Sequence, residues 1–157
     1  MFITTSRKPS SKTRTFCQSL IRALNAEYTN RGKMSFRDVL IKASEFNIIA
    51  VVSQVKGNPS RIEFYDKKGE LLLTLYITES ILDLKGRINT DNLTLRCEVD
   101  ELTSKLLDIL EIDECTDNSC KNIIWVRKGK EEGEAIIEFY GKDGMMVNPK
   151  IYVRRFE

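Results

Sequence analysis

Two periods of hydrophobic residues alternate along the chain and predict a mixed α/β fold. Residues 2–5, "FITT", predict a short buried strand, and residues 27–30 predict another. Between these strands, apolar side chains recur every three or four positions, as in a helix over 11–25 with one buried face: Phe16, Cys17, Leu20, Ile21 and Leu24.

A second helix is predicted to begin just after Ser35. Ser35 is a favourable N-cap, Asp38 stands at the third helical position, where it can complete a capping box, and Met34 can pack against Val39. Apolar stretches then predict three strands, at 48–55, 61–66 and 70–78. The segments between them, "GNPS" and "DKKG", are typical of hairpin turns.

The second part of the chain repeats the first. Residues 61–73, "RIEFYDKKGELLL", align without gaps with residues 136–148, "IIEFYGKDGMMVN", and the same offset pairs Ile48 with Ile123. The second part of the chain is itself predicted to have a strand near 93–99, a helix near 100–110, and strands near 123–128, 134–140 and 145–154. The acidic segment "EIDECTDNSCKN" lacks a counterpart of the second helix.

These elements predict one domain of the α/β class, made of two similar halves. The halves span approximately residues 1–80 and 81–157, with residues 79–92 as the crossing between them, and each is expected to be a mixed sheet flanked by helices. If the halves share one architecture, Phe64 and Phe139 occupy equivalent strand positions and point to the same side of the sheet.

Composition narrows the class of protein. The longest apolar runs are strand-sized, well short of the roughly 18–20 residues of a membrane helix, and no secretory signal is evident, so we expect a cytoplasmic protein without a membrane partner. Cys17, Cys97, Cys115 and Cys120 fit reduced thiols there better than a disulfide framework. The chain has no histidine, which disfavours hydrolase chemistry and a zinc site. We expect no metal, no cofactor and no enzymatic activity.

Charge is distributed unevenly along the chain. Residues 1–37 carry eight Lys or Arg and one acid, a net charge of +7, whereas residues 38–157 carry 17 basic and 22 acidic residues, a net charge of −5. A strongly basic segment on an acidic body is typical of a binding site for a polyanion.

Three basic segments are expected to meet at one edge of the sheet: "SRKPSS" (6–11), "NRGKMS" (30–35) and "KGNPSR" (56–61). If the first three strands are parallel, all three segments leave the carboxyl edge, where α/β proteins usually place ligands. Two of them lead into helix N-termini, where cations destabilise the free protein slightly and a bound phosphate reverses that effect. Because no glycine-rich nucleotide loop is present, the spread of cations favours a phosphate backbone, and RNA in particular.

The combination of "ITTSRKPS", "NRGKMS" and "GNPSRIEF" resembles the Brix domain, in particular its short archaeal members and the small-subunit processome protein of that family. The resemblance covers essentially the whole chain. It implies a non-enzymatic ribosome-biogenesis factor that binds pre-rRNA and aids rRNA processing or subunit assembly, with ribosomal or assembly proteins as candidate partners. It also implies two halves that each resemble the anticodon-binding domain of class II aminoacyl-tRNA synthetases.

The predicted RNA-binding residues lie in the basic N-terminal half. The cations expected to bind phosphates are Arg7, Lys8, Lys12, Arg14, Arg31, Lys33 and Arg61. The residues expected to support them as hydrogen-bonding or capping groups are Ser6, Ser10, Ser11, Asn30 and Asn58. Tyr28 is a candidate for stacking on bases, whereas Phe36 is expected in the core. Two alternatives stay open: a module whose basic face docks an acidic protein, and a phosphate-handling enzyme that uses Asp38 or Asp66.

Overall fold

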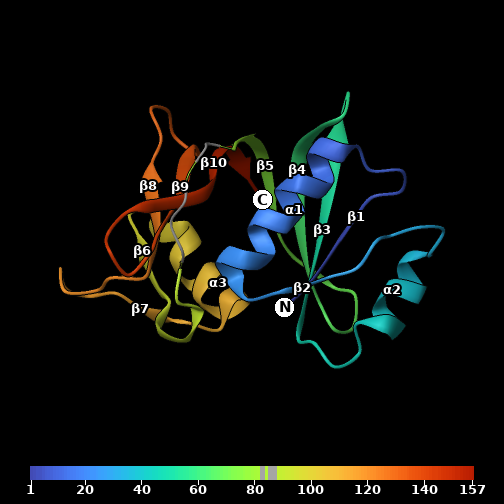
Figure 1. Ribbon diagram of the computed structural model, residues 1–157, viewed down its shortest axis with the longest axis horizontal. Helices are drawn as coiled ribbons and strands as arrows, with labels where there is room; N and C mark the ends of the chain where they lie inside the picture. The colour runs from blue at the N-terminus through green and yellow to red at the C-terminus, as the bar shows by residue number, and fades with distance from the viewer. Residues whose placement is uncertain (82–83, 85–87) are drawn as a thin grey trace.

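A ten-stranded mixed sheet forms the centre of the molecule in the computed structural model, which describes residues 1–81, 84 and 88–157 (Figure 1). The strands are β1 (Phe2–Thr5), β2 (Glu27–Tyr28), β3 (Ile48–Val55), β4 (Asn58–Asp66), β5 (Leu71–Ser80), β6 (Thr94–Cys97), β7 (Asp113–Glu114), β8 (Ile123–Lys128), β9 (Ala135–Tyr140) and β10 (Met146–Phe156). The helices are α1 (Ser11–Leu24), α2 (Phe36–Lys42), the 3-10 turn η1 (Thr90–Asn92) and α3 (Asp100–Leu110).

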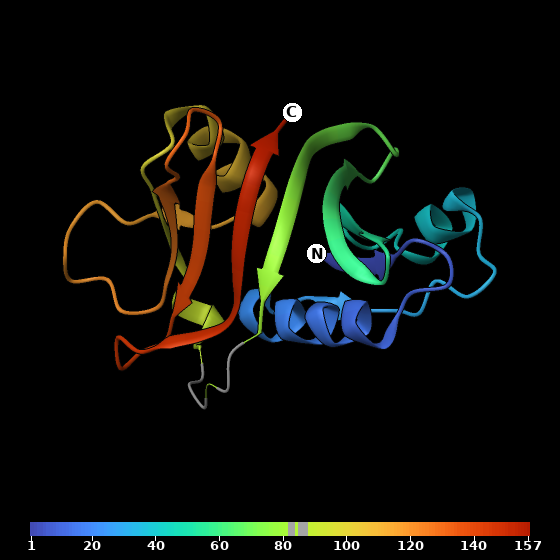
Figure 2. The same cartoon turned by 90° about the horizontal axis from the view of Figure 1, so that it is seen from above.

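The two halves of the chain meet where β5 and β10 lie side by side and antiparallel, at the middle of the sheet (Figure 2). Outward from this seam the order is β5-β4-β3-β1-β2 in the first half and β10-β9-β8-β6-β7 in the second. In both halves the three outermost strands are parallel to one another, as expected for β1, β2 and β3. Phe64 on β4 and Phe139 on β9 are both buried in one core, as the alignment predicts.

Helices cover the two faces of the sheet unequally. On one face, which we call the inner face, Phe16 and Leu20 of α1 and Leu102 and Leu106 of α3 pack into a core shared by both halves. On the opposite, outer face, α2 packs on β1 and β3 of the first half. None of the described helices covers the outer face of the second half.

Local signals explain where the helices begin. Ser35 accepts a hydrogen bond from the backbone N–H of Asp38, and the Asp38 carboxylate accepts one from the backbone N–H of Ser35, so the predicted capping box is confirmed. Met34 packs against the cluster that contains Val39, as expected for a staple. The N-terminus of α3 has no side-chain cap, and Asp100 lies in its acidic first turn, which suits the positive end of the helix dipole.

Several boundaries differ from those predicted. The strand expected at 27–30 ends at Tyr28, and the hairpin after β3 turns at Lys56 and Gly57 instead of over "GNPS". Both turn residues have positive φ, 49° and 78°, which is the geometry of a tight two-residue hairpin turn and lets pairing resume at once. β5 continues to Ser80, into the predicted crossing at 79–92, and residues 82–83 and 85–87 of that crossing lie outside the described residues.

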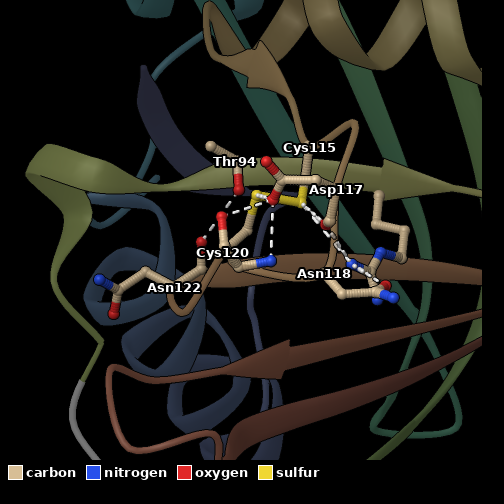
Figure 3. Close-up of a disulfide and its surroundings, with 8 residues drawn as sticks. Thr94, Cys115, Asp117, Asn118, Cys120 and Asn122 are labelled. Atoms are coloured by element: carbon tan, nitrogen blue, oxygen red, sulfur yellow. Dashed lines mark hydrogen bonds between the residues drawn. A yellow bond between two sulfur atoms is a disulfide. The ribbon is translucent and has the colours of Figure 1, made fainter.

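The expectation of four reduced cysteines is wrong. Cys115 and Cys120 form a disulfide in the loop between β7 and β8, while Cys17 and Cys97 are free (Figure 3). The loop folds back on itself because the Asp117 side chain accepts hydrogen bonds from the N–H and hydroxyl of Ser119. This turn brings together two sulfurs that sequence spacing alone does not pair. Bonded to each other, they leave Asp117 without thiolate partners for a metal ion.

Candidate nucleic-acid interface

The three basic segments come together at the carboxyl edge of β1, β2 and β3. The Ser10 hydroxyl donates to the Gly57 carbonyl at 2.6 Å, which joins segment 6–11 to the turn between β3 and β4. The Arg31 guanidinium donates to the Thr5 carbonyl at 3.3 Å, which joins segment 30–35 to the end of β1. We call residues 6–14, 30–35 and 56–61 the basic edge.

Gln54 organises the basic edge, and the sequence did not single it out. Its side-chain oxygen accepts hydrogen bonds from the Ser10 N–H at 2.8 Å and the Thr13 hydroxyl at 2.7 Å. Its side-chain nitrogen donates to the Lys8 carbonyl at 3.3 Å. The sequence signal that could have identified Gln54 was a polar amide near the end of the apolar strand "IIAVVSQV". In the structure this amide is partly buried beside a segment that needs hydrogen-bond partners.

The hydroxyl of Ser10 is used within the protein. As the N-cap of α1, Ser10 accepts a hydrogen bond from the Thr13 N–H at 3.1 Å while it donates to Gly57. Ser10 therefore supports the edge as a capping group, one of the roles predicted for it. Ser11, the first residue of the helix, is exposed, and Ser6 is anchored because its N–H donates to the Val52 carbonyl.

Apart from Lys12, which is exposed but pairs with Glu79, four of the predicted phosphate-binding cations are exposed: Arg7, Lys8, Arg14 and Lys33. None of them forms an ion pair with another described residue. Lys8 has a left-handed backbone with φ of 55°, which is uncommon for a residue with a side chain and is held in place by Gln54. These four side chains are the part of the edge that can neutralise an external anion.

The other three predicted cations contact the protein itself. Lys12 lies 3.2 Å from the Glu79 carboxylate and donates to the Asn58 side chain at 2.9 Å. Arg61 on β4 lies 3.5 Å from Glu63. Besides Thr5, the Arg31 guanidinium donates to the Met34 carbonyl at 2.8 Å, so Arg31 holds the loop that leads into α2.

The charges at the edge repel one another. Partial burial and the nearby positive charge of Arg7 lower the pKa of Arg31, and Asp38 offsets part of this effect. Arg31 nevertheless stays charged, because arginine does not lose its proton in proteins. Two guanidinium groups close enough to disturb each other are stabilised when an anion binds between them.

The remaining candidates have structural roles in this fold. Tyr28 packs partly against the core and donates its hydroxyl to the Asn30 side chain at 3.0 Å, and Phe36 lies in the outer-face core against Tyr65, as expected. The two acids considered for catalysis are engaged locally. Hydrogen bonds from Ser35 lower the pKa of Asp38, and the Asp66 carboxylate accepts two backbone N–H groups in the turn before β5.

Comparison with known proteins bears on the family of the chain. No family model matches the chain. A protein of Methanococcoides burtonii named "Probable Brix domain-containing ribosomal biogenesis protein" is 36% identical over 129 residues, which cover 76% of this chain and 79% of the relative. The chain belongs to the Brix domain-containing ribosomal biogenesis proteins.

Other Brix domain proteins match over shorter segments. Relatives of the same name are 56% identical over 69 residues in Methanothermobacter thermautotrophicus and 40% identical over 79 residues in Methanosarcina barkeri. These segments cover 44% and 50% of this chain, and 43% and 50% of the relatives. The match thus spans about half the length of these two curated relatives.

Solved structures extend the comparison to the whole chain. The crystal structure of Mil, an archaeal Imp4-like protein, superposes with a TM-score of 0.82 and 32% identity, over 100% of this chain and 99% of that one. A probable ribosomal biogenesis protein from Aeropyrum pernix K1 superposes with a TM-score of 0.77 over 98% and 94% of the two chains. At 20% identity, the second match shows the fold alone.

Proposed function

We propose that this Brix domain is a non-enzymatic factor in ribosome biogenesis that binds pre-rRNA through its basic edge and aids rRNA processing or subunit assembly. The observation that carries the proposal is a set of exposed cations, without ion pairs to other described residues, at the edge where three parallel strands end. The family supports the cellular process. A cytoplasmic location remains a prediction, and no described helix is long and apolar enough to cross a membrane.

The arrangement suits a chain of phosphates. Arg7 and Lys8 precede the N-terminus of α1, and Lys33 precedes that of α2, where positive charges are unfavourable in the free protein. A phosphate group changes the sign of that interaction, because amides and cations then all attract the same ligand. Cations on separate loops match successive phosphates of a backbone better than the clustered phosphates of one nucleotide.

The symmetry of the sheet supports a proposal about domain organisation. We propose a single Brix domain over 1–157 that arose by duplication of a unit half its length, with each half related to the anticodon-binding fold. The strand order is mirrored about the seam, and β3 and β8 begin at aligned residues of the repeat, Ile48 and Ile123. β5 and β10 also begin at aligned residues, Leu71 and Met146.

RNA binding measured against salt tests the function. If about five phosphates are neutralised, the log–log salt slope on a single strand is roughly −3.5, at about −0.7 for each phosphate. Changing Arg7, Lys8 and Lys33 together to Ser is expected to weaken binding to all sequences and to make the slope shallower by about 2. Lys12 is left intact because it pairs with Glu79.

The matched control removes the same charge from the acidic half, by changing Lys105, Lys121 and Lys142 to Ser; all three are exposed. Equal weakening by both triple variants would show that net charge alone explains binding and would refute the basic edge. Salt-sensitive binding to an acidic protein, with none to RNA, would replace RNA by a protein partner.

A further inference from the structure

The outer face of the second half is uncovered where the first half carries a helix. In the first half, α2 packs on Phe2, Ile49 and Val51. In the second half the corresponding segment holds only the short strand β7 and the disulfide loop, so the outer face of β8, β9 and β10 has no helix on it among the described residues. The side chains on this face are charged and aromatic, unlike those of an apolar face that a helix would cover.

Cations and aromatic rings alternate on this face. The guanidinium carbons of Arg96 and Arg127 lie 5.2 and 5.3 Å from the centre of the Trp125 ring. The Lys150 ammonium lies 5.3 Å from the centre of the Tyr152 ring, and 39% of Tyr152 is exposed. Cation–π contacts of this kind hold the rings and the charges in fixed positions.

A buried acid fixes two of these cations. Glu138 on β9 is 1% exposed, and its carboxylate lies 3.1 Å from both Arg127 and Lys150 and accepts a hydrogen bond from the Tyr140 hydroxyl at 2.9 Å. The acid lies beneath the surface, and part of each cation reaches it: the Arg127 side chain is 40% exposed and that of Lys150 is 22% exposed, although the Arg127 Nε is buried. The face therefore presents oriented positive charge in the otherwise acidic half of the chain.

The same pattern continues across the seam to the basic edge. Arg61 lies opposite Tyr76 in the pairing of β4 with β5, and Tyr76 lies opposite Arg155 in the pairing of β5 with β10. The Arg155 guanidinium carbon is 4.0 Å from the centre of the Tyr76 ring. We call Tyr76, Arg155, Tyr152, Lys150, Arg127 and Trp125 the outer strip. It runs from β5 to β8, about 14 Å at the usual strand spacing.

We propose that the outer strip binds single-stranded RNA, so that a strand held at the basic edge continues across the sheet into the second half. This inference rests on the proposed function and adds a second contact region to it. Tyr152 offers a ring face to a base, while the Trp125 ring holds Arg96 and Arg127. Lys150, Arg127 and Arg155 bind phosphates in addition to their carboxylate partners, which are Glu138 for the first two and Glu157, at 3.5 Å, for Arg155. An alternation of rings and cations on an open sheet matches the alternation of bases and phosphates in a single strand, as in other sheet-based RNA-binding domains.

Trp125 reports on this face directly, because it is the only tryptophan in the chain. The full chain is titrated with an unstructured RNA of about twelve nucleotides, within the range that one such domain covers. Anisotropy of labelled RNA measures binding, and tryptophan emission measures events at the strip. We expect the tryptophan emission to change in parallel with the anisotropy of the labelled RNA.

Substitution of Tyr152 measures the contribution of stacking. Tyr152→Ala is expected to weaken binding about 5- to 150-fold, the range for losing one stacked base, whereas Tyr152→Phe retains the ring and the affinity. Met145→Ala is the matched control, since Met145 is 66% exposed in the turn between β9 and β10. Thermal unfolding of each variant confirms that it is folded.

The outcomes separate this inference from the proposed function. RNA binding with unchanged Trp125 emission, together with an unaffected Tyr152→Ala variant, would overturn the outer strip and leave the basic edge intact. No RNA binding by the wild-type chain would overturn both. A change in emission with an acidic peptide but not with RNA would assign the face to a protein and overturn the strip as an RNA site.

Discussion

Lys12 allows two electrostatic effects of opposite sign to be compared within one side chain. It stands at the second position of α1, where its charge is unfavourable to the helix dipole. It also pairs with Glu79 on β5 at 3.2 Å. The first effect predicts that Lys12→Ser stabilises the free protein, and the second predicts that the same change destabilises it.

Burial decides between the two effects. The Glu79 side chain is 3% exposed and that of Lys12 is 55% exposed. Removing one partner of a fully buried ion pair costs about 3–5 kcal/mol of stability, while an exposed pair contributes at most about 1 kcal/mol. Because the lysine is half-exposed and the carboxylate is buried, we expect the loss of this pair to cost about 1–2 kcal/mol. Removing the repulsion between the Lys12 charge and the dipole of α1 stabilises the protein by about 0.3–1 kcal/mol. The net effect of Lys12→Ser is a loss of about 1 kcal/mol.

Thermal unfolding followed by circular dichroism measures this difference. For a chain of this size, a loss of about 1 kcal/mol lowers Tm by about 2–4 °C. A cycle of Lys12→Ser, Glu79→Gln and the double variant isolates the energy of the pair. Arg14→Ser is the matched control, because Arg14 is exposed on the same helix and has no ion pair with another described residue. A rise in Tm for Lys12→Ser equal to that for Arg14→Ser would refute the reasoning.

Three further predictions follow from other contacts. Ser10→Ala is expected to cost about 1 kcal/mol, because it removes the cap of α1 and a hydrogen bond to the β3–β4 turn, whereas Ser11→Ala is close to neutral in urea unfolding. Burial alone would raise the pKa of Glu138, but its hydrogen bonds and the adjacent cations hold that pKa below its usual value of 4.5. The contribution of Glu138 to stability is therefore complete above pH 4.5 and is lost as the pH falls through the lower pKa of the folded state. We expect acid unfolding of Glu138→Gln to depend less on pH than that of the wild type, and an unchanged pH profile would contradict this. Reduction of the disulfide between Cys115 and Cys120 is expected to lower stability by no more than about 2 kcal/mol, because the loop it closes is short, and to leave RNA affinity unchanged in the same anisotropy assay.

The sequence alone determined features that depend on neighbouring residues. The capping box of Ser35 and Asp38 spans a single helical turn, and the apolar period placed α1 and α3 to within about one residue. The internal repeat anticipated that Phe64 and Phe139 occupy equivalent buried strand positions. The three parallel strands were also expected, since right-handed crossovers constrain the order in which strands and helices can pack.

Tertiary structure decided which of the candidate residues face a ligand and which are used by the fold. Lys12 pairs with Glu79, and Gln54 accepts a hydrogen bond from Ser10, only because segments far apart in the sequence become neighbours in the folded protein. The outer strip likewise depends on β5 pairing with β10, which brings Arg155 onto Tyr76 from far along the chain. Hydrophobic period and capping act within a few residues, whereas pairing across the seam is set by the packing of both halves on one core, and no local pattern encodes it.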